Sequence, residues 1–125
     1  MSAPLILLVS SDPHAEAVVH AEVTSAGRKM RQLASDYGAM AVIHAALREA
    51  ALALVDLDPG LHGYELCRAA AHHMPVIVLT GDPDPSVEEK ARDHGACGCL
   101  HKPLDAEEVR ALLDQTLGVE APLEL

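Results

Sequence analysis

Hydrophobic residues occur along the chain in short unbroken runs, separated by longer segments with helical spacing. Four of the runs are apolar throughout or nearly so, and a fifth, at Lys29–Ala34, is weaker. The four clear runs are Leu5–Val9, Leu52–Val55, Val76–Leu79 and Cys97–His101. Short segments that are apolar on both faces are typical of parallel strands covered by helices on each side. The pattern therefore predicts a parallel sheet built from these runs.

The segments between the runs predict helices, because their apolar residues recur at helical spacing or their composition favours helix. The predicted helices are His14–Ala26, Gly38–Ala50, Tyr64–His72, Pro85–His94 and Asp105–Leu117. Asp12 followed by Pro13 predicts an N-cap with proline in the first turn. Asp105 and Glu108 have the spacing of a capping box, which marks the start of the last helix.

Strands and helices alternate five times with short connections. This order predicts an α/β fold, a three-layer sandwich with a five-stranded parallel sheet. Right-handed crossovers leave few topologies, and we expect the flavodoxin-like strand order 2-1-3-4-5. The length of 125 residues suits one domain. We expect this domain to span residues 1–118, followed by a loose C-terminal tail at 119–125.

Composition excludes several classes of function. The chain has no Phe, no Trp and two Tyr, so its core must be aliphatic and offers no aromatic platform for single-stranded nucleic acid. Its formal net charge of −10 supplies no basic patch, which argues against direct nucleic-acid binding. No segment reaches the roughly 20 apolar residues of a membrane helix. The short N-terminal apolar run and the three cysteines predict a cytoplasmic protein with reduced thiols.

Polar residues follow the predicted strands at the edge of the sheet where ligands gather, outside the carboxyl ends of the strands. These residues are Ser10, Ser11, Asp12, Asp56, Asp58, Thr80, Gly81 and Lys102. A carboxylate can act as a nucleophile, a hydroxyl can bond phosphoryl oxygens, and an ammonium can neutralise developing charge. Asp56, Thr80 and Lys102 are therefore candidates for a phosphoryl-transfer site.

The order and spacing of these motifs resemble those of response-regulator receiver domains, the CheY-like family, over nearly the whole chain. The residues that carry the resemblance are Asp56, Pro59–Cys67, Met74–Gly81 and Leu100–Leu104. The resemblance implies that Asp56 is the phospho-accepting aspartate and Thr80 the switch hydroxyl. It implies that Lys102 pairs with the acceptor or its phosphate, and that the Lys102–Pro103 peptide bond is cis.

The resemblance also implies a function. Receivers are signalling modules of bacterial two-component systems and phosphorelays, so the chain is expected not to be an enzyme beyond self-phosphorylation at Asp56. The implied partners are a sensor histidine kinase, a phosphotransfer protein or an effector protein, with Mg²⁺ as the cofactor. The face made by the last two helices is a common receiver interface, and the resemblance allows a dimer there.

The first departure from the family concerns the metal. Ser10 and Ser11 stand where receivers carry two acidic residues that help to hold Mg²⁺. Magnesium prefers carboxylate oxygens in octahedral geometry, so neutral hydroxyls are poor substitutes. Asp12 lies one residue beyond the acidic pair, and we expect it to cap the first helix, although a metal role stays open.

The second departure lies after the acceptor. Pro59 follows Asp56 by three residues, whereas receivers usually place this proline four residues on. Asp58 is then either a metal-binding side chain or, as we prefer, a turn residue ahead of the proline. With Asp56, Asp12 and Asp58 as the only candidate ligands, Mg²⁺ binding is expected to be weak or absent.

The third departure concerns the last strand. Cys99 stands three residues before Lys102, where receivers usually carry Tyr or Phe, so the aromatic part of the usual readout is missing. Cys97, Cys99 and His101 alternate and therefore share one face of the strand. They form either a soft ligand set for a transition metal or, as we prefer, ordinary sheet surface.

Two versions of the receiver interpretation follow. Asp56 either accepts a phosphoryl group with little help from Mg²⁺, or the domain is a pseudo-receiver that signals through protein contacts. The missing carboxylates favour the second version, because metal neutralisation supplies much of phosphoryl-transfer catalysis. The alternatives are a flavodoxin-like cofactor-binding protein, for which phosphate-binding and aromatic residues are lacking, and a metal-regulated scaffold supported only by the cysteine and histidine face.

Overall fold

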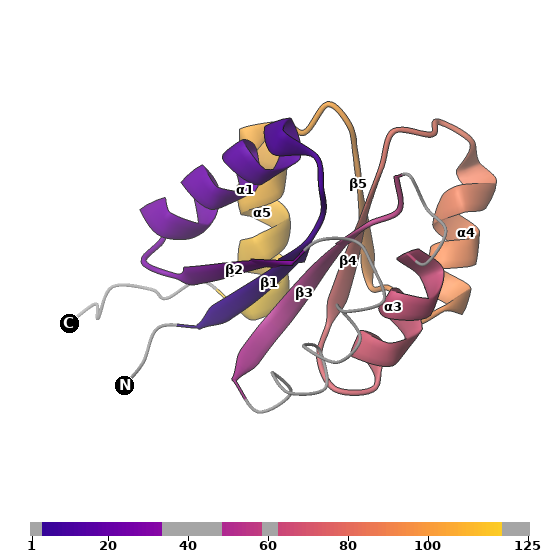
Figure 1. Cartoon of the computed structure of the whole chain (residues 1–125), viewed down its shortest axis with the longest axis horizontal. Coiled ribbons are helices and arrows are strands. Elements are labelled where there is room, and N and C mark those ends of the chain that lie inside the picture. The colour runs from indigo at the N-terminus through magenta and orange to yellow at the C-terminus, as the bar shows by residue number, and fades with distance from the viewer. Residues whose placement is uncertain (1–3, 34–48, 59–62, 119–125) are drawn as a thin grey trace.

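The computed structural model describes residues 4–33, 49–58 and 63–118, which contain five strands and four helices (Figure 1). The strands are β1 (Leu5–Val9), β2 (Lys29–Leu33), β3 (Ala50–Asp56), β4 (Val76–Thr80) and β5 (Gly98–His101). The helices are α1 (Pro13–Ser25), α3 (Gly63–Ala71), α4 (Pro85–Asp93) and α5 (Ala106–Leu117).

The strands form one parallel sheet in the order β2-β1-β3-β4-β5. Helices α1 and α5 cover one face of the sheet, and α3 and α4 cover the other (Figure 1). The predicted three-layer α/β sandwich and its strand order are therefore confirmed. In this topology the carboxyl ends of β1, β3, β4 and β5 lie along one edge of the sheet, at the top of Figure 1.

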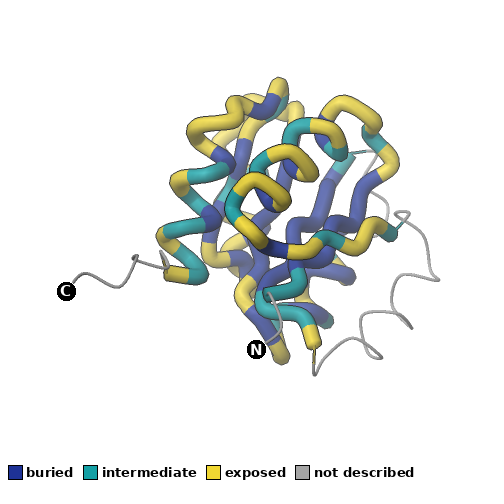
Figure 2. Tube along the Cα trace, turned by 90° about the vertical axis from the view of Figure 1, so that its left-hand side faces the viewer, coloured by how far each residue is buried: buried dark blue, intermediate teal, exposed yellow. Residues whose placement is uncertain are grey.

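Two aliphatic cores fill the spaces above and below the sheet. Successive strand side chains point to opposite faces, so Leu7 and Val9 join the core under α3 and α4, while Ile6 and Leu8 join the core under α1 and α5. All four side chains are fully buried, as are the central strands in general (Figure 2). Burying one such side chain contributes about 1.5–3 kcal/mol, which explains why these runs are apolar on both faces.

The position of β2 at the edge of the sheet explains why its hydrophobic pattern is weak. Lys29, Arg31 and Gln32 are exposed, and among the described strands β2 pairs only with β1. Charged residues on an edge strand oppose pairing with other chains. The strand therefore needs fewer apolar residues than β1, β3 or β4.

Aspartates begin three of the helices. The Asp12 carboxylate accepts hydrogen bonds from the amides of His14 and Ala15 at the start of α1. Asp84 and Asp105 cap α4 and α5 in the same way. The predicted N-caps at Asp12 and Asp105 are confirmed, and each satisfies backbone donors that the first turn of a helix leaves unpaired.

Some predicted element bounds need correction. Ala50 belongs to β3 rather than to the predicted helix Gly38–Ala50, because it pairs with Leu5 of β1. The rest of that segment, apart from Glu49, lies outside the described residues, as does the predicted tail 119–125. Strand β5 begins at Gly98, so Cys97 precedes it.

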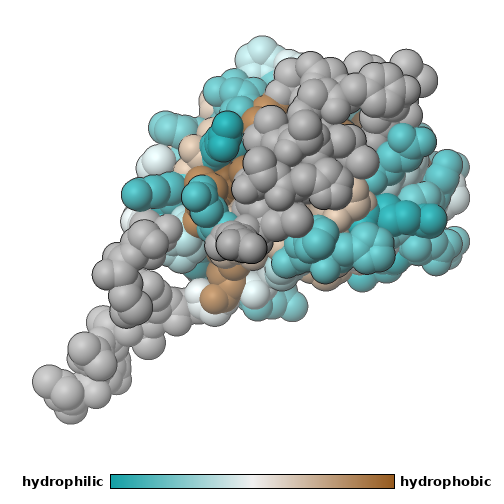
Figure 3. Space-filling view, turned by 60° about the horizontal axis from the view of Figure 1, so that its bottom comes forward, coloured by the Kyte–Doolittle hydropathy of each residue, from teal (hydrophilic) through white to brown (hydrophobic). Residues whose placement is uncertain are grey.

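The surface at the end of the sheet opposite to the polar strand ends is seen in Figure 3. Among the described residues it presents mostly hydrophilic side chains, with hydrophobic ones between them. None of the described helices combines the length and the apolarity that crossing a membrane requires. The apolar residues of this chain are instead concentrated in the two cores.

Candidate functional site

The candidate site lies where the strands end. Asp56 is the last residue of β3, Thr80 the last of β4, and Lys102 directly follows β5. The backbone amide of Lys102 donates to the carbonyl of Thr80 at 2.8 Å, which fixes the end of β5 beside that of β4. The sequence-predicted residues therefore meet at one edge of the sheet, although they are far apart in the chain.

The Asp56 carboxylate is held from several directions and is completely shielded from solvent, with a side-chain exposure of 0%. Its Oδ2 accepts from the Ser10 hydroxyl at 2.6 Å and from the Lys102 ammonium at 2.8 Å. Its Oδ1 accepts from the backbone amide of Asp58 at 2.9 Å. Burying a carboxylate without hydrogen-bond donors is costly, so these three contacts offset the cost of burying Asp56.

The contact between Ser10 and Asp56 is a feature that the sequence interpretation missed. Val9 of β1 pairs with Val55 of β3, so the next residues, Ser10 and Asp56, lie side by side at the sheet edge. Ser10 is fully buried there. Strand order together with register would have revealed the pair. From the sequence, Ser10 was considered only as a poor metal ligand.

Lys102 is the common counterion of the site. Its Nζ lies 2.8 Å from Asp56, 3.0 Å from Asp12 and 3.6 Å from Asp58. Burial opposes the charged form of the lysine, but hydrogen bonds with Asp56 and Asp12 outweigh it and raise the Lys102 pKa above its ordinary value. One ammonium therefore neutralises part of the charge of three carboxylates.

Asp12 uses its two carboxylate oxygens for different purposes. Oδ1 caps helix α1, while Oδ2 pairs with Lys102. The hydrogen bond with Lys102 lowers the pKa of Asp12, burial opposes the shift, and the amides of Ala15 and His14 add to it. Asp12, which follows Ser10 and Ser11, therefore adds a negative charge to the site through its ion pair with Lys102.

The loop after β4 is joined to the site through Asp58. The amide of Gly81 donates to Asp58 Oδ2 at 2.5 Å. Thr80 is 1% exposed, and its hydroxyl accepts from the amide of Asp82 at 3.0 Å. Within the described residues the Thr80 hydroxyl makes no hydrogen bond to Asp56. The Lys102–Pro103 peptide bond is cis, as the resemblance implies.

The oxygens of the site do not fit a magnesium ion. Asp56 Oδ2 is taken by a hydroxyl and an ammonium, Asp12 Oδ1 by the helix cap, and Asp58 Oδ2 by an amide. The Lys102 ammonium lies within 3.6 Å of all three carboxylates. In the described part of the chain, no group of three or more His, Cys, Asp and Glu residues is arranged to hold a metal ion.

The cysteine and histidine face of β5 gives no sign of a metal site. Cys99 Sγ and His101 Nε2 lie 4.0 Å apart in a weak sulfur–nitrogen contact, Cys97 lies outside the strand, and the described residues hold no group of three or more such side chains arranged for a metal ion. Cys99 packs against the core under α3 and α4.

The thiols differ in environment, which makes a testable prediction. Burial raises the pKa of the Cys67 and Cys99 thiols to about 11, whereas Cys97 is exposed. At a pH of about 8 only about one in a thousand of the former thiols is ionised. Iodoacetamide is therefore expected to alkylate Cys97 first, as peptide mapping can establish. The variant Cys97→Ser should lack the fast phase, and equal rates at all three thiols would contradict the assignment.

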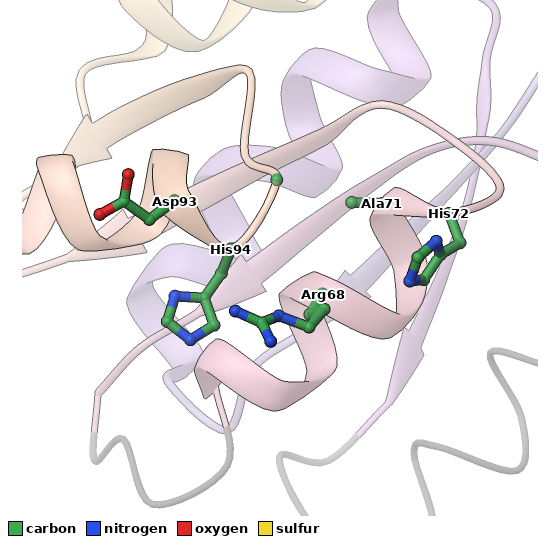
Figure 4. A pocket seen from close by; sticks show the side chains of 6 residues that line it. Arg68, Ala71, His72, Asp93 and His94 are labelled. Atoms are coloured by element: carbon green, nitrogen blue, oxygen red, sulfur yellow. The ribbon is translucent and has the colours of Figure 1, made fainter.

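A shallow pocket of about 320 Å³ lies at the opposite end of the sheet, near the carboxyl ends of α3 and α4 (Figure 4). It is lined by Arg68, Ala71, His72, Asp93, His94 and Gly95. None of the sequence-predicted site residues lines it. Its basic side chains lie beside an acid and near helix carboxyl ends, which do not favour an anionic ligand. The strand-end cluster therefore remains the candidate functional site.

Comparison with known proteins gives the family. A family model described as the response regulator receiver domain matches residues 6–114. A putative response regulator from Chloroflexus aurantiacus is 26% identical with a TM-score of 0.81, and covers 92% of this chain and 98% of that one. A response regulator receiver protein from Burkholderia phymatum is 27% identical with a TM-score of 0.79, and covers 96% and 99%. No curated protein sequence matches the chain.

A more distant structure supports the fold alone. A response regulator from Thermotoga maritima is 18% identical, with a TM-score of 0.80, and covers 92% of this chain and 98% of that one. The family model spans most of the chain, including the end of every strand that contributes to the site. The chain therefore belongs to the response-regulator receiver domain family, the receiver modules of two-component signalling.

Proposed function

We propose that this receiver passes its signal through protein contacts, with Asp56 serving as a buried structural anion rather than as a rapidly phosphorylated acceptor. The observation that carries the proposal is the pair of donors on Asp56 Oδ2, the Ser10 hydroxyl and the Lys102 ammonium. Receivers generally bind Mg²⁺ at an acidic site. Here a neutral serine stands in place of one of the acids and bonds the acceptor itself.

The chemistry of phosphoryl transfer supports this proposal. To act as a nucleophile, Asp56 must offer an oxygen lone pair to phosphorus while nearby positive charge neutralises the incoming phosphoryl oxygens. Both of its oxygens are engaged and its side chain is shielded from solvent. The nearest cation, Lys102, is shared with Asp12 and Asp58. Phosphoryl transfer therefore requires the contacts of Asp56 and Lys102 to break before the charge of the phosphoryl oxygens can be neutralised.

The second candidate function is a receiver in which Asp56 does accept a phosphoryl group. It is supported by the position of Asp56, Thr80 and Lys102 at the same edge of the sheet. Receivers in general interact with histidine kinases, phosphotransfer proteins and effectors, and we propose a partner from these classes, in the cytoplasm. The family match leaves the flavodoxin-like cofactor alternative without support.

Labelling with acetyl phosphate tests the proposal. The donor would pass its phosphoryl group to an Asp56 oxygen and release acetate. With millimolar Mg²⁺, we expect intact-protein mass spectrometry to find no phosphoryl adduct above the level of the control Asp56→Asn. Titration with Mg²⁺ alone is expected to leave the circular dichroism spectrum of the protein unchanged. Strong labelling that disappears in Asp56→Asn would establish the second candidate function instead.

A further inference from the structure

Asp58 joins two loops of the site through a single oxygen atom. Its Oδ2 accepts from the Gly81 amide at 2.5 Å and lies 3.6 Å from the Lys102 ammonium. Gly81 begins the loop between β4 and α4, whereas Asp58 follows β3. The two loops meet because β3 and β4 are parallel neighbours, with Asp56 opposite Leu79. One carboxylate thus contacts both a backbone donor and the shared cation.

We propose that Asp58 is an internal latch: its carboxylate holds the loop after β4 in one position and occupies donors that an anion on Asp56 would need. The inference rests on the proposed function, since it explains how the loop is held without phosphate. Asp58 is then the residue that limits the response of the site to a phosphoryl group.

The competition follows from the donors present. A phosphoryl group on Asp56 adds oxygens that need ammonium, amide and hydroxyl donors. Lys102 already bonds Asp56, and the Gly81 amide follows Thr80 at the adjacent end of β4; Asp58 contacts both of these donors. A phosphoryl oxygen therefore has to displace the Asp58 carboxylate or share its donors with it. Two anions that share one cation repel each other, which disfavours the shared arrangement.

Gly81 itself fits the latch. A Cβ atom at this position would lie 3.2 Å from Asp58 Oδ2, which is a close contact. The absence of a side chain thus lets the carboxylate reach the amide. Beyond Gly81 the loop is ordered by further aspartates, since Asp82 accepts from the amide of Asp84 and Asp84 accepts from that of Ser86. Releasing Gly81 should therefore loosen the start of the loop and leave α4 capped.

Amide hydrogen exchange tests the latch without any phosphodonor. In Asp58→Ala the Gly81 amide loses its acceptor, and its exchange rate by NMR is expected to rise about tenfold relative to the unmodified protein. Asp82→Asn is the matched control, because it removes one negative charge from the same loop without touching the bond to Gly81. Unchanged Gly81 exchange in Asp58→Ala, or an equal rise in Asp82→Asn, would overturn the latch.

A second measurement tests the competition. Beryllium fluoride, an analogue of a phosphoryl group on a carboxylate, is titrated into the unmodified protein, Asp58→Ala and Asp82→Asn. We expect about tenfold tighter binding to Asp58→Ala, and a smaller gain in Asp82→Asn, since Asp58, unlike Asp82, contacts the Gly81 amide and Lys102. Equal affinity in the unmodified protein and Asp58→Ala, including no binding to either, would overturn the competition.

The two proposals can fail separately. Strong acetyl phosphate labelling of the unmodified protein would refute the proposed function, yet the exchange of Gly81 would still report whether Asp58 holds the loop. Unchanged Gly81 exchange would refute the latch, and the absence of labelling would then still support a receiver that works without phosphate.

Discussion

Replacing Lys102 with methionine is expected to lower the free energy of unfolding by about 3 kcal/mol, because the buried Asp56 carboxylate then loses its cation. Methionine keeps most of the length and the apolar stem of lysine, so the loss reports charge rather than volume. For a domain of this size the melting temperature should fall by about 10 °C, measurable by circular dichroism. The ion pairs of Lys102 with Asp12 and Asp58 are lost as well.

The double variant Asp56→Asn with Lys102→Met provides the control. The neutral amide that replaces the carboxylate needs no counterion, so most of the stability lost in Lys102→Met should return. Arg92→Met, which breaks the exposed pair with Glu88, should change the melting temperature by less than about 2 °C. If Lys102→Met melts like the unmodified protein, the ammonium is not the counterion of Asp56.

The second large effect is expected from Ser10→Asp. Ser10 is buried, and its hydroxyl lies 2.6 Å from Asp56, so the variant places a second carboxylate against the first. In the presence of EDTA the free energy of unfolding should fall by about 2–4 kcal/mol, because two buried anions then share one lysine. Millimolar Mg²⁺ should restore much of it, since a second acid adds the type of ligand that magnesium prefers.

Gln115→Glu is the control for this variant. Gln115 is exposed on α5, so the same added charge should change stability little with or without Mg²⁺. Thermal melts in EDTA and in Mg²⁺ separate the two variants. A Ser10→Asp protein that is destabilised equally in both solutions would show that acids at the end of β1 do not restore a metal site in this receiver.

The order of elements could be predicted because this fold depends on local patterns. Runs such as Leu5–Val9 are apolar on both faces, and only a covered parallel strand needs that. Asp12 and Asp105 predicted the starts of two helices, because a capping hydrogen bond spans only two or three residues and is therefore visible in the local sequence. The bounds were less accurate where pairing decided them, as at Ala50, which joins β3 because Leu5 lies opposite it.

The residue types of the site were also visible in the sequence. Asp56, Thr80 and Lys102 were recognisable from motif spacing, and the serines at positions 10 and 11 marked the absence of the usual acids. The residue types and their spacing alone therefore determined the resemblance to the family and the main departure from its usual pattern.

Only the tertiary structure decided how these groups are partnered. Ser10 bonds Asp56, and Asp58 bonds Gly81, because parallel pairing brings the ends of separate strands within hydrogen-bond distance. These partners are 46 and 23 residues apart in the chain, so no local pattern encodes them. The sequence by itself determined an aliphatic α/β receiver with serines at positions 10 and 11, after its first strand. The packing of the strand ends determined that a single lysine is shared by three carboxylates from separate loops.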